Sequence, residues 1–286
     1  GHDALVFEAD MTLLNELKAF MPPDRRTGWP TGLVFNMAYG IQGEARYTHV
    51  PGMLEMAGVP YTGATPLGHA VSLDKVISKV LMQQASVPTP AFVVMRDPHA
   101  AMDNLRFPLV VKPRRESTSN GLRVARNRAE LADAVTEVVT NYPDEEALVE
   151  EFIAGRELCV GLLGNDPVHC LPLVELDFGD RALPTFTWDD KYHKSADEPQ
   201  RICPAAIDEA TRRQLEEVAI ATFRACHCRD YARVDIRLDE RGTPYVLEIN
   251  SMTSLGLGGS FLFAARQAGY TFDSLVCRIL DLARAR

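Results

Sequence analysis

Residues 231–250, YARVDIRLDERGTPYVLEIN, form the clearest structural element in the sequence. Two runs of alternating apolar residues flank the turn sequence DERG at 239–242, a pattern typical of a β-hairpin. Asp235 lies inside the first run, and Glu248 and Asn250 lie two residues apart at the end of the second. Because residues two apart on a strand share a face, we expect the hairpin to bring these three oxygen-bearing side chains together.

Carboxylate and amide oxygens are the ligands that Mg²⁺ prefers, with water and phosphate oxygens completing its coordination. We therefore expect Asp235, Glu248 and Asn250 to bind a metal, although hydrogen-bonded acids at such positions can also be structural. Arg233 lies two residues before Asp235 and shares its face, where a guanidinium can stabilise an oxyanion beside the metal.

Upstream of the hairpin, Lys112 ends the apolar strand pattern LVVKP and precedes a stretch rich in Ser, Thr, Asn and Gly, residues 114–121. A fixed cation beside a loop with many backbone N–H groups and hydroxyls suits phosphate oxygens. The alternative is a lysine that is simply solvated. The chain contains neither the Walker sequence GxxxxGK[ST] nor a strand followed by GxGxxG, so this is not a P-loop or a Rossmann site.

The chain before residue 87 alternates between strand and helix patterns, which predicts a parallel sheet. The expected strands cover 4–9 and 32–37, and the expected helices cover 11–20, 50–57 and 68–86. From residue 91 onward the pattern changes to pairs of strands around helices. We expect strands at 91–95, 108–113, 122–125, 147–152, 157–164 and 168–176, and helices at 130–140 and 208–225. The change of pattern indicates a domain boundary near residue 87.

The composition excludes several classes of protein. The 286 residues are 46% hydrophobic and 24% charged, which is ordinary globular usage. The excess of 39 acidic over 30 basic residues gives a net charge of −9 and argues against nucleic acid or an anionic membrane as a partner. No apolar run reaches the length of a membrane span, and no export signal opens the chain, so we expect a cytoplasmic protein.

The six cysteines are best interpreted as buried reduced thiols. Only Cys226 and Cys228 lie close together, and their C-H-C spacing is unlike the C-x-x-C pairs of zinc and redox sites. Reduced thiols also suit a cytoplasmic location.

In their order along the chain, these motifs resemble the ATP-grasp superfamily, and more closely the D-alanine:D-alanine ligase family. The resemblance runs from about residue 33 to the C-terminus. It rests on the segments GMLEMAGVPYTG, SLDKVISK, VVKPRRESTSNG, LVEEFIAGREL, DDKYHK, CPA, RVDIRL, LEIN and AARQAGYTFDSLVCRIL. Agreement of this many ordered segments by chance is very improbable.

The resemblance implies a mixed α+β and α/β architecture with an ATP-grasp fold. An N-terminal α/β domain with a partial parallel sheet would cover residues 1–86 and is expected to lack its first β-α unit. The ATP-grasp domain would cover 87–286. It would consist of a small nucleotide-gripping subdomain, 87–155, and a metal- and substrate-binding subdomain, 156–286.

The resemblance also implies roles for individual residues on the nucleotide side. Lys75 and Lys112 would contact the phosphates, and Glu157 would hold the ribose hydroxyls. The adenine would meet a connector and an apolar slot, made of Glu150, Glu151, Phe152 and Ile153 and of Val110, Leu122 and Leu247. A mobile lid at 181–195 would carry Lys191 to the γ-phosphate and Tyr192 to the substrate. Asp235, Glu248 and Asn250 would hold two Mg²⁺ ions, which Mn²⁺ can replace, and Arg233 would stabilise the oxyanion.

The amino-acid side departs from the family. Tyr39 stands where the family has a histidine, and Thr118 replaces a serine that links the lid to the substrate. After LEIN the sequence reads SMTSLGLGGS, which places Gly259 where the family has a serine for the carboxylate of the second amino acid. Ser260, one residue later, is a candidate substitute. We expect the substrates to contact Tyr39, Glu44, Ser254, Gly259 and Ser260.

The expected function is that of an ATP-dependent ligase that joins a carboxylate to an amine through an acyl phosphate, as in D-alanine:D-alanine ligase. One alternative is a related enzyme of specialised metabolism that joins another amino acid to a small carboxylate or a cyclohexenimine, as mycosporine-forming ligases do. Another is an ATP-binding regulatory protein without turnover. The expected partners are small amino-acid or carboxylate substrates and a second copy of the chain in a homodimer.

Overall fold

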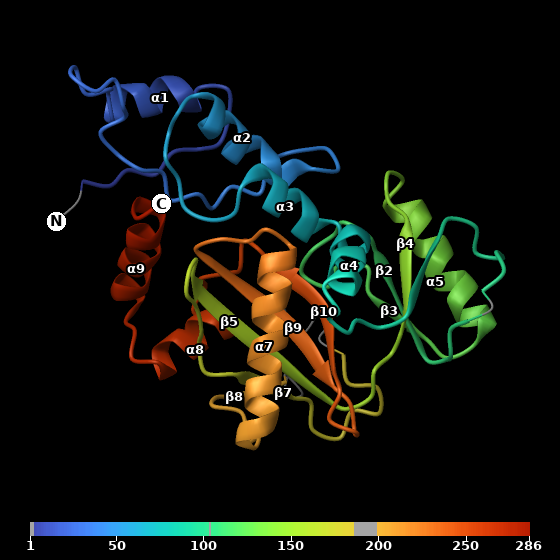
Figure 1. The fold of residues 1–286 in the computed structure, drawn as a ribbon. Coiled ribbons are helices and arrows are strands. Elements are labelled where there is room, and N and C mark those ends of the chain that lie inside the picture. The colour runs from blue at the N-terminus through green and yellow to red at the C-terminus, as the bar shows by residue number, and fades with distance from the viewer. Residues whose placement is uncertain (1–2, 103, 186–198) are drawn as a thin grey trace.

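The computed structural model describes residues 3–102, 104–185 and 199–286, and its strands form two antiparallel sheets with helices packed on them (Figure 1). The first sheet has four strands in the order β1-β4-β2-β3. Their bounds are β1 Phe92–Met95, β2 Leu109–Pro113, β3 Arg123–Ala125 and β4 Ala147–Glu151. Helix α5 (Arg128–Asn141) covers this sheet, and its Leu131 and Val135 share an apolar core with the strands.

The second sheet has six strands, in the order β10-β9-β5-β7-β8, with β6 paired to β5. Their bounds are β5 Arg156–Gly164, β6 Val168–Cys170, β7 Val174–Asp177, β8 Gln200–Ile202, β9 Tyr231–Leu238 and β10 Pro244–Asn250. The strand expected at 168–176 is thus two strands, β6 and β7. The connection from β4 to β5 links the two sheets.

Alternation of side chains decides which face of the second sheet is apolar and which is charged. Val234 and Ile236 of β9 pack in one core with Leu215 and Phe223 of helix α7 (Glu209–Ala225). Asp235 lies between Val234 and Ile236 on the strand and therefore points to the other face of the sheet. Part of that other face is covered by helices α8 (Ser260–Gln267) and α9 (Phe272–Arg284), which leaves the rest for the site.

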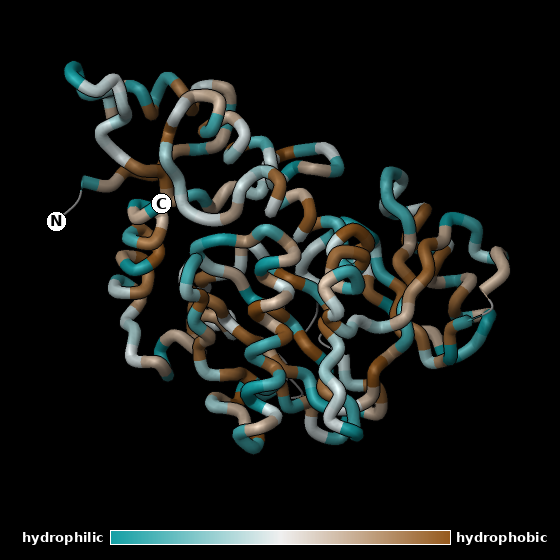
Figure 2. Tube along the Cα trace, viewed as in Figure 1, coloured by the Kyte–Doolittle hydropathy of each residue, from teal (hydrophilic) through white to brown (hydrophobic). Residues whose placement is uncertain are grey.

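The apolar residues gather along the strands and on the helix faces that cover them (Figure 2). In the part of the chain that the structure describes, no helix is long and apolar enough to cross a membrane.

The hairpin of β9 and β10 forms as its sequence predicts. Asp239 closes the turn, where its side chain accepts hydrogen bonds from the backbone N–H groups of Arg241 at 2.9 Å and Thr243 at 2.7 Å. Gly242 has a φ of +79°, a conformation that glycine adopts without strain. A register shift between Val246 and Glu248 marks a bulge in β10, and a bulge re-aims the side chains beyond it.

The expected parallel sheet before residue 87 is the main correction. Among the described residues no strand precedes β1, and only an isolated parallel bridge between Val34 and Tyr61 represents the strand expected at 32–37. The strand expected at 4–9 does not form, and there the side chain of Val6 is 96% exposed. A strand pattern needs a neighbouring strand to satisfy its backbone, and this segment pairs with none.

The N-terminal helices are α1 (Leu13–Phe20), α2 (His49–Met56), α3 (Pro66–Leu73) and α4 (Lys75–Gln84), with the short 3₁₀ turn η1 (Arg46–Thr48) before α2. The single helix expected at 68–86 is divided at Asp74, whose backbone is extended with ψ of 99°. Its side chain accepts from the N–H groups of Val76 and Ile77, so Asp74 is the N-cap of α4.

Candidate active site

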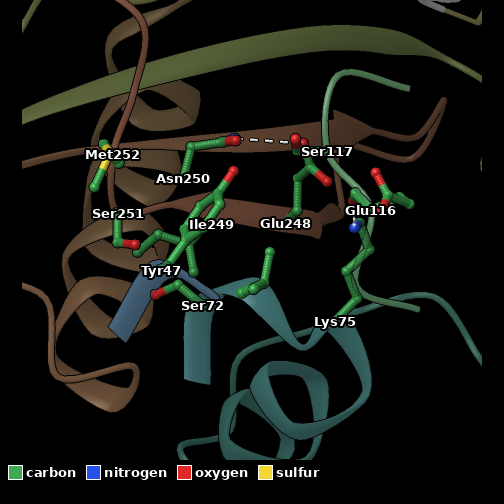
Figure 3. A pocket seen from close by; sticks show the side chains of 11 residues that line it. Tyr47, Ser72, Lys75, Glu116, Ser117, Glu248, Ile249, Asn250, Ser251 and Met252 are labelled. Atoms are coloured by element: carbon green, nitrogen blue, oxygen red, sulfur yellow. Dashed lines mark hydrogen bonds between the residues drawn. The ribbon is translucent and has the colours of Figure 1, made fainter. Parts of the chain in front are cut away.

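Arg233, Asp235 and Arg237 follow one another on one face of β9, and we call them the charged row. Glu248 lies opposite Asp235 across the hairpin, and Asn250 lies opposite Arg233. Arg233 donates from Nε and Nη2 to the two oxygens of Asp235, each at 2.7 Å. Nδ2 of Asn250 lies 3.0 Å from Asp235 Oδ2. It also lies 3.3 Å from Glu248 Oε1 (Figure 3). The structure therefore gathers the expected metal ligands beside the expected oxyanion donor.

This donor set fits a divalent cation. Two carboxylates and an amide suit Mg²⁺, which takes few protein oxygens and fills its other positions with water and phosphate. Within residues 3–102, 104–185 and 199–286, no group of three or more His, Cys, Asp and Glu side chains offers another metal site. Although burial opposes it, Asp235 raises the pKa of Arg233, so this guanidinium stays charged and balances part of the acidic charge.

Three lysines approach this face from the other sheet and from α4. Glu150 is 2% exposed and is paired with Lys112 Nζ at 2.5 Å and with Lys79 Nζ at 2.9 Å. Burial opposes ionisation of this carboxyl, yet the two ammonium groups lower its pKa. Burial lowers the pKa of Lys79 to about 8 in spite of Glu150. Lys75 donates to the carbonyl of Glu116, and burial lowers its pKa as well.

Lys112 also faces the second sheet. Burial opposes its charge, but Glu150 and then Glu248 raise its pKa, and Glu157 acts in the same direction. Lys75 interacts with both Glu248 and Lys112. The two lysines expected to bind phosphate therefore lie over the acidic residues of the hairpin.

The residues expected around adenine lie where the two sheets meet. Val110 of β2 is in register with Glu150 of β4, and Leu247 lies at the bulge of β10. Glu151 turns away, because its carboxylate accepts from the Arg106 guanidinium at two distances of 3.2 Å. The remaining three residues lie in the connection after β4 and just before β3: Phe152, Ile153 and Leu122.

Glu157, expected at the ribose, lies opposite Arg237 in the pairing of β5 with β9. Glu157 Oε2 is 2.8 Å from Arg237 Nη2. The ion pair therefore lies two residues along the charged row from Asp235, which is about 7 Å on an extended strand.

A cavity opens beside the end of β10 and has two chemically different ends (Figure 3). We define its charged end by Lys75, Glu116 and Glu248. Its neutral end is defined by Tyr47, Ser72, Ser251 and Met252. Ser117, Ile249, Asn250 and Leu73 complete the lining. Of these residues, only Lys75, Glu248 and Asn250 were expected from the sequence to belong to the site.

The neutral end is held by a buried histidine of α3. His69 is 1% exposed, and its Nδ1 lies 2.9 Å from the hydroxyl oxygen of Ser251. Burial, followed by the charge of Arg229, lowers the pKa of His69 to about 4, so the imidazole is neutral at physiological pH. Burial likewise raises the pKa of Tyr47. One weak sequence signal points to this end of the cavity, because Ser251 directly follows the LEIN motif.

The expected substrate residues are less closely gathered. Tyr39 packs against Tyr47 with the rings tilted by 53° and their centroids 5.2 Å apart, so it adjoins the neutral end. Glu44 is paired instead with Arg115, and Thr118 donates to the Ser117 carbonyl at 2.6 Å.

Polar groups in the loop after β10 form hydrogen bonds with one another. The Ser254 hydroxyl oxygen accepts from Gly256 N–H at 3.1 Å, and the Gly259 N–H donates to the Gly256 carbonyl at 2.8 Å. A Cβ added to Gly259 would lie 3.1 Å from two carbonyl oxygens, those of Gly256 and Ser254, so a serine does not fit without a shift of the loop. Ser260, the first residue of α8, is buried. Lys191 and Tyr192 lie outside the described residues.

Comparison with known proteins bears on this arrangement. The family model described as D-ala D-ala ligase C-terminus matches residues 81–281. The chain belongs to the D-alanine:D-alanine ligase family. The D-alanine--D-alanine ligase of Pelotomaculum thermopropionicum is 32% identical over 262 residues, which cover 88% of this chain and 80% of that protein. A protein of Sinorhizobium fredii named y4sG is 52% identical over 288 residues, covering 100% of this chain and 84% of y4sG.

Solved structures of the family share the fold. The D-alanine--D-alanine ligase of Bacillus anthracis, solved as a complex with ATP, has a TM-score of 0.70 at 23% identity and covers 83% of this chain and 75% of its own. The D-alanine-D-alanine ligase of Coxiella burnetii has a TM-score of 0.73 at 24% identity. The match covers 90% of this chain and 69% of that ligase. The expectations of an ATP-grasp fold and of membership in this family are confirmed. As a member, the protein is an ATP-dependent ligase that forms C–N bonds.

Proposed function

We propose that this ligase joins the carboxylate of one amino acid to the amine of a second through an acyl phosphate, with Asp235, Glu248 and Asn250 as its metal ligands. The observation that carries the proposal is the gathering of these residues beside Arg233, with Lys75 and Lys112 over the same face. Such a constellation has both the acidic oxygens that a metal needs and the cations that phosphates need.

A carboxylate does not react with an amine until one of its oxygens is made a good leaving group. Transfer of the γ-phosphoryl group of ATP to a carboxylate oxygen gives an acyl phosphate and ADP. The amine then attacks the acyl carbon, the C–O bond to phosphate breaks, and phosphate leaves while the nitrogen loses a proton. Lys75 and Lys112 hold phosphate oxygens, and Arg233 donates to the oxygen that becomes negative at the acyl carbon. Divalent cations bound at the hairpin would balance the charge of the triphosphate.

We propose two Mg²⁺ ions at this site, with Mn²⁺ as a substitute. Asp235, Glu248 and Asn250 would hold the ions, and triphosphate oxygens would supply further ligands. We also propose, from the family resemblance, that Lys191 reaches the γ-phosphate and Tyr192 the substrate. The nucleotide would lie over Glu157 with its base in the slot of Val110, Leu122 and Leu247.

A second candidate concerns the acceptor. The carboxylate of a second amino acid, held in a partly dry site, needs hydrogen-bond donors. The Gly259 N–H already donates to the carbonyl of Gly256. The neutral end of the cavity offers hydroxyls in place of a cation. We therefore propose that the preferred substrates differ from D-Ala plus D-Ala, as in a ligase of specialised metabolism that takes another amino acid, a small carboxylate or a cyclic imine.

The test is a screen of substrate pairs with the full chain, Mg²⁺ and ATP, following ADP release and product mass. ADP release coupled to a product heavier than either substrate by their condensation supports the ligase. Retention of ATP binding without ADP release for every pair would instead identify a regulatory ATP-binding protein. If D-Ala-D-Ala forms faster than every other product, the altered acceptor preference is wrong and the ligase assignment stands.

We propose that the protein works in the cytoplasm as a homodimer on small molecules, without nucleic acid or a membrane. All six cysteines, each among the described residues, are free thiols, which suits a reducing compartment. Light scattering of the purified chain at micromolar concentration tests the dimer.

A further inference from the structure

Arg237, which pairs with Glu157, is the most buried residue of the charged row. Its side chain is 3% exposed, against 11% for Asp235 and 18% for Arg233, and the side chain of Glu157 is 10% exposed. The two partners lie opposite each other on β5 and β9, and their contact is 2.8 Å long. A buried carboxylate without a counter-ion is very costly, so Arg237 compensates the charge of Glu157.

Arg237 is itself held from several directions. Its Nη1 donates to the Gly155 carbonyl at 3.2 Å, and its Nη2 donates to the carbonyl of Pro184. The guanidinium carbon lies 5.2 Å from the ring centroid of Phe152 and 5.6 Å from that of Phe178. A planar guanidinium fixed by two carbonyls, one carboxylate and two aromatic rings cannot swing out to reach a ligand. Arg237 can therefore affect ligand binding only through the position of the Glu157 carboxylate.

We infer that Arg237 is a positioning residue that sets the preference for ribonucleotides over deoxyribonucleotides by fixing Glu157. The inference rests on the proposed function, in which Glu157 accepts hydrogen bonds from the ribose hydroxyls. A carboxylate can distinguish a ribonucleotide from a deoxyribonucleotide only if its oxygens stay within hydrogen-bond distance of the ribose hydroxyls. The reason is that a hydrogen bond weakens steeply with distance and angle. Lysine in place of Arg237 keeps the charge and loses the planar guanidinium that the two carbonyls and the two rings hold in place beside the carboxylate.

The experiment measures the dissociation constants of Mg²⁺·ATP and Mg²⁺·2′-deoxyATP by calorimetry, with the full chain and without amino acids. In the wild-type protein we expect deoxyATP to bind about tenfold to a hundredfold more weakly, the range for one hydrogen bond to a charged group. Arg237→Lys should reduce this ratio to below about threefold, and Glu157→Gln should do the same. The double variant should match Glu157→Gln alone, because Arg237 acts only through Glu157.

Arg156→Lys is the matched control. Arg156 forms a two-point pair with Glu175 on the same sheet, with both contacts at 2.6 Å, but outside the charged row. We expect this variant to keep the wild-type ratio. If Arg237→Lys does not fold, Phe178→Leu removes one ring from the guanidinium and should lower the ratio about twofold to threefold.

An unchanged ratio in folded Arg237→Lys, or in Phe178→Leu where it is the variant used, overturns the inference and leaves the ligase assignment intact. Equal affinities in the wild type overturn the ribose role of Glu157 together with the inference. The substrate screen decides separately whether the protein is a ligase, since it measures product rather than nucleotide preference.

Discussion

Beside the charged end of the cavity, buried side chains form ion pairs, as Glu150 does with Lys79 and Asp235 with Arg233. At the neutral end, the hydroxyl of Ser251 lies against an uncharged imidazole, that of His69. The two ends therefore select ligands by different means. Paired charges prepare a site for the fixed charges of a metal and triphosphate, whereas neutral hydrogen bonds leave the choice of a second substrate to shape and hydroxyl placement.

Turnover should depend most strongly on Asp235, which lies beside the charged end on the hairpin. Asp235→Asn removes an anionic ligand and leaves Arg233 without its partner, so we expect turnover to fall at least about a thousandfold, or about 4 kcal/mol in transition-state stabilisation. The measurement is ADP release over a titration of Mg²⁺ and Mn²⁺. Wild-type activity in this variant would remove the metal site from the hairpin.

The second prediction concerns the buried lysines. Lys79→Met leaves Glu150 with a single counter-ion, and we expect the free energy of unfolding to fall by about 3 kcal/mol. Replacing Glu150 by Gln in that background should deepen the loss, because the buried Lys112 then loses its counter-ion. Urea unfolding gives both values, with the exposed Lys18→Met as the control. A loss below about 1 kcal/mol for Lys79→Met would show that Glu150 does not need a second counter-ion.

The neutral end makes a pH prediction. The folded-state pKa of His69 is about 4, below the usual 6.5, so the unfolded chain takes up this proton first as the pH falls. Stability is therefore unaffected above pH 6.5 and declines below it, by about 2 kcal/mol at pH 5. His69→Gln does not titrate, so the difference in unfolding free energy between wild type and variant should shift by this amount between pH 7.5 and 5. His169→Gln, at an exposed position, serves as the control. If the unfolding free energies of wild type and His69→Gln change in parallel with pH, the buried imidazole of His69 is not held neutral.

The smallest effect is expected at the hydroxyl of Ser251. Ser251→Ala removes one hydrogen-bonding group from the neutral end, and we expect kcat/KM for the second substrate to fall about tenfold. The dissociation constant of ATP should stay within twofold of wild type, which is the internal control. A loss of ATP affinity equal to the loss in kcat/KM would show that the two ends do not act separately.

The residues around the hairpin could be predicted in detail because their contacts are local. Glu248 and Asn250 share a face by strand geometry, and the turn at Asp239 fixes the register with Asp235. The strand expected at 4–9 failed because a pattern of apolar residues does not say whether a partner strand exists. The interruption of the helix at Asp74 was missed although aspartate is a common N-cap, because the apolar spacing continues across it.

Local sequence predicts the ATP-grasp hairpin, the shared face of Arg233 and Asp235 and the lysine that ends LVVKP, because alternation and turn chemistry act over a few residues. Which partners those charges meet, and the place of Arg237 beside them, depend on the tertiary structure. Glu157 and Arg237 are 80 positions apart in the chain, as their numbers show, and His69 and Ser251 are 182 apart. Such pairs arise from the packing of α3 and β5 against the hairpin, and packing depends on every element at once, so no local pattern records them.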